Sequence, residues 1–317
     1  MNKKNLFHYN SKILKVSELA AIAVYDFIGK KDENAADKAA VEAMRTELNK
    51  LDFSGTIVIG EGERDKAPML YIGEKVGNGK SGLNFDIALD PLEGTKITAN
   101  NEKNALTVIS LGNKGSFLNA PDVYMEKIAV GPDLPNGVID LDKSIKKNIE
   151  DLADAKNKKP NDLIACVLNR PRHNKIVQVL NEMSVNIQYI TDGDVSGVIS
   201  VALKSSNIDI YLGTGGAPEG VLAASALSCL NGQMQGRLIF EDQKQILRAK
   251  KLGIVDLKKK YNIENMVKGD VIFCATGVTD GDLVAGIKDR GDSFSSETLT
   301  LHKSSNTNRI VKKLSKK

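Results

Sequence analysis

Apolar residues recur at helical spacing near the amino terminus. The pattern predicts one helix over residues 17–28, which Gly29 would end, and a second helix that begins after Asn34 and reaches about Leu51. The apolar face of the second helix holds Asp37, Ala40, Met44, Leu48 and Leu51. An acid in a first turn usually supports the helix cap, so Asp37 has two candidate roles, in the cap and in a site beside that face.

Two apolar stretches with strand character end in acidic residues. Residues 56–59 run into Gly-Glu-Gly-Glu at 60–63, and residues 85–89 run into Asp-Pro-Leu-Glu-Gly-Thr at 90–95. Because strand side chains alternate, Asp90 lies on the face opposite the apolar one, and the proline after it is expected to stop the strand. Neighbouring carboxylates repel one another unless a cation lies between them, and oxygen ligands without His or Cys favour magnesium or manganese. Each cluster alone is also compatible with a turn, since Asp-Pro and Glu-Gly are common turn dipeptides.

Strand-like and helix-like stretches alternate in the second half of the chain. Strands are predicted over residues 163–168, 185–190 and 208–212, and helices from Asn174, Val195 and Pro218. This rhythm is typical of an α/β layer with its loops on one side. We also expect a strand pair formed by 106–111 and 127–131, and a surface helix within 140–162 that joins two lobes, 1–160 and 161–317.

Three loops after these predicted strands carry groups that suit a sugar phosphate. Guanidinium groups such as those of Arg170 and Arg172 bind phosphate oxygens in a two-pronged fork, although a solvated basic turn has the same composition. The carboxylates of Asp-Gly-Asp at 192–194 can accept hydrogen bonds from sugar hydroxyls or cap the next helix. Glycines within 213–216 allow close backbone approach, and the helix start after them offers free amides to an anion. Glu219 in that helix start is better suited to a cation than to a phosphate.

Composition favours a globular enzyme. The chain has 317 residues, of which 41% are hydrophobic, and this is ample for one large unit or two lobes. The formal charge of +4 is modest and the lysines concentrate only in the tail, so neither a nucleic-acid partner nor a membrane partner is expected. Residues 1–10 lack an apolar signal core, which favours a cytoplasmic location. Cys166, Cys229 and Cys274 lie in apolar runs without paired spacing and are interpreted as core residues.

The acidic motifs and the later loops together resemble the bacterial class II fructose-1,6-bisphosphatases. The matching runs, in order over nearly the whole chain, are residues 60–63, 67–74, 90–95, 117–127, 170–173, 192–194 and 215–220. That family is one of the metal-dependent, often lithium-sensitive phosphatases that include the inositol monophosphatases. The resemblance implies an α/β (α+β) layered sandwich, the sugar phosphatase fold, with two sheets between helix layers. Members often carry Lys where this chain has Glu33.

The resemblance also implies the hydrolysis of fructose 1,6-bisphosphate, a small-molecule sugar bisphosphate, to fructose 6-phosphate and inorganic phosphate, with Mn²⁺ or Mg²⁺ as cofactor. The implied metal ligands are Asp37, Glu61, Asp90, Glu93 and Glu219. The implied catalytic residues, which orient the attacking water, are Thr95, Glu61 and Asp65. The implied substrate-binding residues are Glu93, Gly94, Thr95, Tyr124, Arg170, Pro171, Arg172, Asp192, Gly193, Asp194 and Gly216. A role in gluconeogenesis or a reductive pentose cycle and a homodimer or homotetramer are further implications.

Three other functions stay open at this point. A dual enzyme that also accepts sedoheptulose 1,7-bisphosphate would carry the same motifs. Residues 213–215 before a helix, with Glu241 after a later apolar stretch, loosely imitate a dinucleotide-binding fingerprint, although the glycines do not match the full pattern. A sugar-phosphate-binding regulator without catalysis is disfavoured, because every acid that catalysis would require is present.

Overall fold

The computed structural model describes residues 4–62 and 69–317, which form two compact units. Unit 1 combines Met1–Leu118 with Val267–Lys317, and unit 2 is Asn119–Met266. The predicted lobes, 1–160 and 161–317, divide the chain at one point, whereas the compact units divide it at two. The difference arises because the carboxyl-terminal strands pair with strands of the first half and so return the chain to unit 1.

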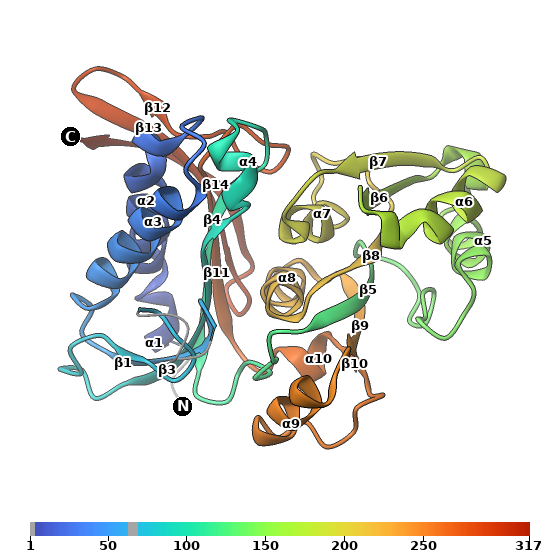
Figure 1. The fold of residues 1–317 in the computed structure, drawn as a ribbon, viewed down its shortest axis with the longest axis horizontal. Coiled ribbons are helices and arrows are strands. Elements are labelled where there is room, and N and C mark those ends of the chain that lie inside the picture. Colours follow the sequence, from blue (N-terminus) through green and yellow to red (C-terminus); the bar gives the residue numbers. More distant parts are fainter. Residues whose placement is uncertain (1–3, 63–68) are drawn as a thin grey trace. The chain divides into compact units, whose positions relative to one another are not determined.

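Unit 1 is built on an eight-stranded mixed sheet. Its strands are β1 (Ser54–Ile59), β2 (Lys75–Val76), β3 (Asn84–Glu93), β4 (Leu106–Asn113), β11 (Val271–Gly277), β12 (Lys288–Asp289), β13 (Ser293–His302) and β14 (Thr307–Lys316). The strand order is β12-β13-β11-β4-β3-β1-β2, and β14 pairs with β13. The helical segments are α1 (Lys4–Phe7), α2 (Asn10–Val24), η1 (Tyr25–Phe27), α3 (Glu33–Leu48) and α4 (Thr95–Ala99). Figure 1 shows α2 and α3 side by side against the sheet. Apolar side chains of both helices lie in one buried core with those of the sheet.

Three predicted boundaries in unit 1 need correction. The first helix begins at Asn10 rather than at residue 17, because polar residues share its first turns with buried Ile13 and Val16. The second helix is capped by Asp32, whose carboxylate accepts the Ala35 N–H, and not by a residue at 34. Strand β3 continues past the proline to Glu93, since a shift of register after residue 90 absorbs the missing N–H.

Unit 2 contains a six-stranded mixed sheet. Its strands are β5 (Tyr124–Val130), β6 (Ile164–Leu168), β7 (Asn186–Ile190), β8 (Ile210–Gly216), β9 (Gln233–Ile239) and β10 (Lys260–Asn262), in the order β10-β9-β5-β8-β6-β7. The helical segments are α5 (Ile145–Ala155), η2 (Pro160–Asp162), η3 (Pro171–His173), α6 (Asn174–Glu182), α7 (Asp194–Ser200), α8 (Ala217–Leu230), α9 (Gln243–Lys251) and α10 (Ile263–Met266). The predicted alternation is confirmed, and β6 is parallel to both β7 and β8.

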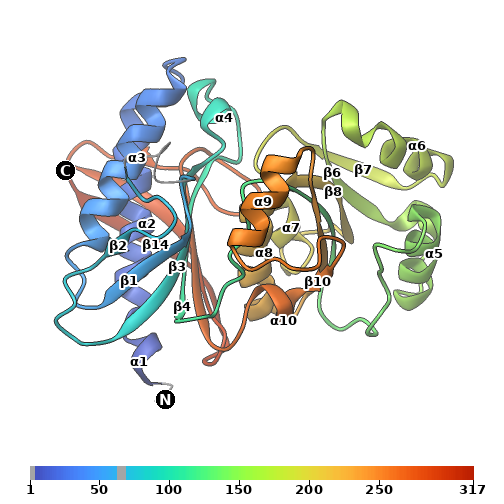
Figure 2. The ribbon, with the colours of Figure 1, turned by 60° about the horizontal axis from the view of Figure 1, so that its bottom comes forward.

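Helices cover both faces of the unit 2 sheet (Figure 2). Alternation along β5 shows this, because Ile128 packs in one core with α5 and α6, whereas Lys127 faces α7 and α8. The predicted strand pair is wrong, since residues 106–113 belong to the unit 1 sheet and β5 belongs to unit 2. Two mixed sheets with covering helices confirm the predicted α/β layered class. No helix in the described ranges is long and apolar enough to cross a membrane.

Candidate active site

The acids of unit 1 lie at the carboxyl ends of two neighbouring strands. β1 and β3 are parallel and adjacent, so the segments that follow them leave the sheet at the same edge. Glu61 follows β1, where its N–H donates to the Leu70 carbonyl at 3.1 Å. A Cβ at Gly60 would lie 2.2 Å from that same carbonyl, so only glycine fits the approach. Asp90, from β3, is half-buried at the same edge.

Repulsion between carboxylates shows that three predicted ligands lie close together. Burial, followed by the charge of Asp90, raises the pKa of Asp37 from 3.8 to about 6. Burial, followed by the charges of Asp90 and Asp37, raises the pKa of Glu61 from 4.5 to about 8. One oxygen of Asp90 and one of Glu93 also lie within 4.8 Å of each other. The structure therefore brings these four acids of unit 1 together.

These side chains fit a hard divalent cation. They offer only carboxylate oxygens, the donor type that magnesium and manganese prefer. Burial, followed by the charge of Asp90, disfavours the ionised forms of Asp37 and Glu61, and a bound cation would favour those forms. Asp37 lies within α3, beyond its capped first turn, so the alternative role in the cap belongs to Asp32.

Gly94 and Thr95 form the turn from β3 into α4. Gly94 has φ +92°, and a Cβ there would come within 2.7 Å of the Ile97 side chain. Thr95 is the first residue of α4, and no side chain caps this helix. The Thr98 hydroxyl donates to the Gly94 carbonyl at 2.9 Å. Thr95 therefore follows the N-cap residue Gly94, and half-buried Thr95 stays a predicted catalytic residue.

The basic loop of unit 2, residues 170–173, is held in place by contacts with neighbouring residues. An Arg170 guanidinium nitrogen donates to an Asp192 carboxylate oxygen at 3.0 Å. Arg172 donates from Nε to the Thr214 carbonyl at 2.9 Å, and its guanidinium lies over the Tyr124 ring, 4.9 Å from the centroid. A solvated basic turn would lack such contacts. Pro171 begins the short helix η3 between the two arginines.

His173 holds the glycine loop, residues 213–216, in place. Its Nδ1 lies 2.7 Å from the Leu168 carbonyl, and its Nε2 accepts the Thr214 N–H at 2.8 Å. The neutral ring with its proton on Nδ1 satisfies both bonds. Burial lowers the pKa of His173, which keeps this form at neutral pH.

The Asp-Gly-Asp loop separates its two acids. Asp192 is half-exposed, whereas Asp194 begins α7 and is 3% exposed. Lys127 Nζ donates to both Asp194 carboxylate oxygens, at 2.9 and 2.7 Å, and the Tyr211 hydroxyl donates to one of them at 2.9 Å. Gly193 has φ +62°, which allows the sharp entry into α7. Sequence reasoning missed Lys127 and Tyr211, although a lysine in the middle of an apolar strand was a signal.

Gly216, Glu219 and Asp65 are the remaining predicted site residues. Gly216 ends β8, and a Cβ there would lie 1.8 Å from a Glu219 carboxylate oxygen, which explains the glycine. Glu219 lies in the first turn of α8 in unit 2. Its role as a metal ligand stays a prediction. Asp65 and the neighbouring acid at 63 lie outside the described residues.

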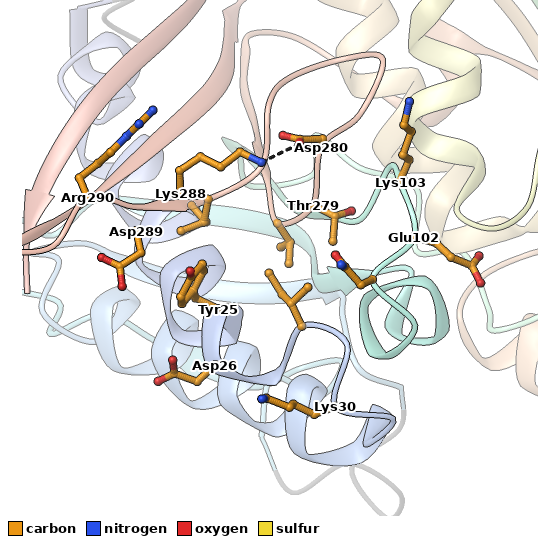
Figure 3. A pocket seen from close by; sticks show the side chains of 14 residues that line it. Tyr25, Asp26, Lys30, Glu102, Lys103, Thr279, Asp280, Lys288, Asp289 and Arg290 are labelled. Carbon is orange, nitrogen blue, oxygen red and sulfur yellow. Dashed lines mark hydrogen bonds and ion pairs between the residues drawn. The ribbon is translucent and has the colours of Figure 1, made fainter.

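A different cavity in unit 1, of about 1050 Å³, contains none of the predicted site residues. Tyr25, Asp26 and Lys30 contribute to one side of it, and Asp280 and Lys288 form an ion pair of 2.6 Å within it (Figure 3). Its four basic side chains are matched by four acidic ones, so no net charge selects a ligand.

An oxygen-only acid cluster and loops with paired arginines define a metal-dependent phosphatase of the α/β class. The chain belongs to the family described as bacterial fructose-1,6-bisphosphatase, glpX-encoded, which matches residues 8–315. The fructose-1,6-bisphosphatase 1 class 2 of Escherichia coli strain K12 is 43% identical over 314 residues, which cover 95% of this chain and 93% of that protein. A protein of Synechocystis, named D-fructose 1,6-bisphosphatase class 2/sedoheptulose 1,7-bisphosphatase, is 39% identical over 324 residues, with 95% and 94% covered. A solved inositol monophosphatase from Anabaena is 14% identical with a TM-score of 0.41, covering 72% of this chain and 83% of that one.

The dinucleotide-binding alternative does not fit the sheet. In that fold the acid that binds the ribose ends the strand next to the glycine loop's own strand. Here Glu241 follows β9, and β5 separates β9 from β8. Both β8 and β9 run antiparallel to β5 and are therefore parallel to each other, but β5 lies between them, so the adjacent parallel strands that the fingerprint needs are absent at this place.

Proposed function

We propose that this protein hydrolyses fructose 1,6-bisphosphate to fructose 6-phosphate and inorganic phosphate, using a divalent cation. The observation that carries the proposal is the cluster of acids in unit 1, where Asp90 lies beside Glu93 and where burial, followed by the charge of Asp90, raises the pKa values of Asp37 and Glu61. Such repulsion is costly in a metal-free protein and disappears when a cation binds. The names of the relatives supply the substrate.

The acids of unit 1 would hold the cation. When bound, a divalent cation polarises a phosphoryl group and makes water more acidic. Glu61 and Thr95 would orient the attacking water, with the Thr95 hydroxyl both donating and accepting hydrogen bonds. Glu219 and Asp65 complete the predicted set, and replacing each carboxylate tests that assignment.

The loops of unit 2 would bind the sugar and its second phosphate. Arg170 and Arg172 carry permanent charge, and their forks suit phosphate oxygens. Contacts with Asp192 and with the Tyr124 ring already orient both side chains, which reduces the entropy lost when a ligand binds. The backbone of Gly216 and the Asp192 carboxylate would contact the sugar.

The family also suggests the cation, the assembly and the biological setting. We propose manganese or magnesium as the cation, a homodimer or homotetramer as the assembly, and gluconeogenesis in the cytoplasm as the setting. The dual name of the Synechocystis relative supports a second substrate, sedoheptulose 1,7-bisphosphate.

Two variants in the same strand test the metal site. Asp90→Asn removes the charge that raises both pKa values, so metal-dependent phosphate release should disappear. Asp86→Asn is the matched control, because Asp86 is buried and accepts the Gly115 N–H at 2.6 Å, a bond that asparagine can keep. Manganese at about 100 times its dissociation constant would add roughly 2.7 kcal/mol to the stability of a native protein that binds it, and thermal melting detects this.

The measurements are phosphate release and thermal melting, each with and without manganese. Wild type and Asp86→Asn should both be active and show the manganese-induced rise in melting temperature. Asp90→Asn should fold, lose activity and show no such rise. Unchanged turnover and an unchanged melting shift in Asp90→Asn would mean that the acids are structural.

A further inference from the structure

A buried ion pair lies under the glycine loop of unit 2. The side chains of Lys127 and Asp194 are 0% and 2% exposed, and their charged groups are 2.7 Å apart. Lys127 is the one fully buried lysine among the described residues. The Tyr211 hydroxyl completes the cluster, and burial followed by the Asp194 charge raises the Tyr211 pKa well above its ordinary value.

Stability alone does not explain why this ion pair is buried. Removing two charges from water is costly, and apolar residues of similar volume often serve stability as well or better. The acid Asp209 shows the more usual arrangement, because it is also buried but pairs with Lys156 and Lys158, whose side chains reach solvent. The Lys127–Asp194 pair has no such access.

The backbone of the glycine loop rests directly on this pair. A Cβ on Gly215 would lie 2.2 Å from an Asp194 oxygen and 3.2 Å from Lys127 Nζ. On the other side of Lys127, a Cβ on Gly220 in α8 would lie 3.2 Å from the lysine Cε. The loop and the start of α8 can therefore approach only because both positions are glycine.

The contacts continue from the pair to the basic loop. Thr214, next to Gly215, donates its N–H to His173 and accepts from Arg172 Nε. A shift of Gly215 would move this peptide and the arginine that it orients. Asp194 also fixes the loop that carries Asp192, the partner of Arg170.

We propose that Lys127, Asp194 and Tyr211 are positioning residues for substrate binding, and that Asp194 acts through Lys127 and the glycine loop without touching the sugar. The proposal rests on the proposed function and assigns a role to two residues that the sequence did not suggest. It also replaces the predicted direct contact of the Asp194 carboxylate with substrate, because that side chain is 2% exposed and accepts three hydrogen bonds from Lys127 and Tyr211.

A double-mutant cycle tests the proposal. The variants are Lys127→Met, Asp194→Asn and the combination of both, in which the buried site is neutral and so avoids an unpaired charge. Asp209→Asn is the control, because it weakens a buried ion pair before β8, at the opposite end of that strand from the glycine loop.

We expect KM for fructose 1,6-bisphosphate to rise at least tenfold in all three variants, with the double variant no worse than the worse single one. Turnover of p-nitrophenyl phosphate should change less than threefold, since that small ester does not need both phosphate sites. The double variant should melt at a higher temperature than the singles. Asp209→Asn should lower the melting temperature and leave KM unchanged. Additive KM effects would overturn the proposal, since they would indicate that Asp194 binds substrate independently of Lys127.

Amide hydrogen exchange gives a second measurement that requires no activity. The Thr214 amide should exchange at least tenfold faster in the double variant than in wild type, and at the wild-type rate in Asp209→Asn under native conditions. Wild-type protection of Thr214 in the double variant would overturn the proposal. If wild type fails to hydrolyse the bisphosphate, the proposed function fails, and the exchange rates alone decide whether the ion pair positions the loop.

Discussion

Metal binding should release protons, because two of the carboxylates in unit 1 have pKa values raised to about 6 and about 8. With pKa values of about 6 for Asp37 and about 8 for Glu61, the metal-free protein carries about one proton on this pair at pH 7. The same values place about two protons there near pH 5 and almost none near pH 9.5. A cation needs both groups ionised, so these protons leave when it binds.

The pH dependence follows with a definite sign. A raised pKa favours the folded protein while the proton is bound, so this contribution is complete below the ordinary value of 4.5 for Glu61 and is lost as pH rises through about 8. At about 1.4 kcal/mol per pKa unit, the loss for Glu61 is at most about 5 kcal/mol. The metal-free protein should therefore become less stable from pH 5 to 8, while its affinity for manganese rises about sixfold between pH 7 and 8.

Calorimetric titration with manganese, in two buffers of different ionisation enthalpy, counts the released protons. Wild type and the control Asp86→Asn should release about one proton at pH 7. Removing the neighbouring charge lowers both pKa values, although burial still raises them, so any residual binding to Asp90→Asn should release fewer protons than binding to wild type. Tight binding to wild type without proton release between pH 6 and 8 would refute the claim that the metal-free site holds a proton on these carboxylates.

Three further substitutions test single residues. Thr95→Ser should keep substantial activity. Thr95→Val should lose about two to four orders of magnitude in turnover with little change in melting temperature, because positioning and proton transfer are lost. A stable, active Val variant would remove Thr95 from the mechanism. Arg172→Ala should raise KM for the bisphosphate about tenfold to a hundredfold, as expected for a lost charge-assisted bond, and affect p-nitrophenyl phosphate less; equal effects on both would contradict its role at the second phosphate. Gly215→Ala should destabilise the protein by about 1–3 kcal/mol, because its Cβ would overlap an Asp194 oxygen; an unchanged melting temperature would show that the loop is looser than described.

The local elements of this fold could be predicted where the periodicity was strong. Helix α3 has Ala40, Met44 and Leu48 fully buried along the predicted face. The strands and helices from residue 163 onward follow the predicted alternation. In both cases one repeating pattern of apolar residues decides which face is buried, and short-range physics is sufficient.

Long-range pairing could not be predicted in the same way. β4 was expected to pair with a strand near it in the sequence, but its partners are β3 and the distant β11. The apolar residues of β4 are equally compatible with either pairing, because they indicate a strand buried on both faces and do not specify its neighbour. The return of the carboxyl-terminal segment to unit 1 was missed for that reason.

Some features of the candidate site could be predicted from the sequence and others could not. The acids at the ends of β1 and β3 were recognised from their place after apolar runs, and the structure brings Asp37, Glu61 and Asp90 together. Asp194 resembled Asp192 in sequence, yet only contacts with Lys127 and Tyr211 show that it is buried and fully bonded. A sequence motif does not reveal which of two similar acids points into the protein.

The most direct test of the central claim is phosphate release by the purified protein from four compounds, with manganese and with a chelator. The compounds are fructose 1,6-bisphosphate, sedoheptulose 1,7-bisphosphate, fructose 6-phosphate and inositol monophosphate. We predict that fructose 1,6-bisphosphate releases one phosphate per molecule only when manganese is present, and that fructose 6-phosphate and inositol monophosphate release little. Release from the sedoheptulose compound would identify a dual enzyme. No manganese-dependent release from either bisphosphate would contradict the account.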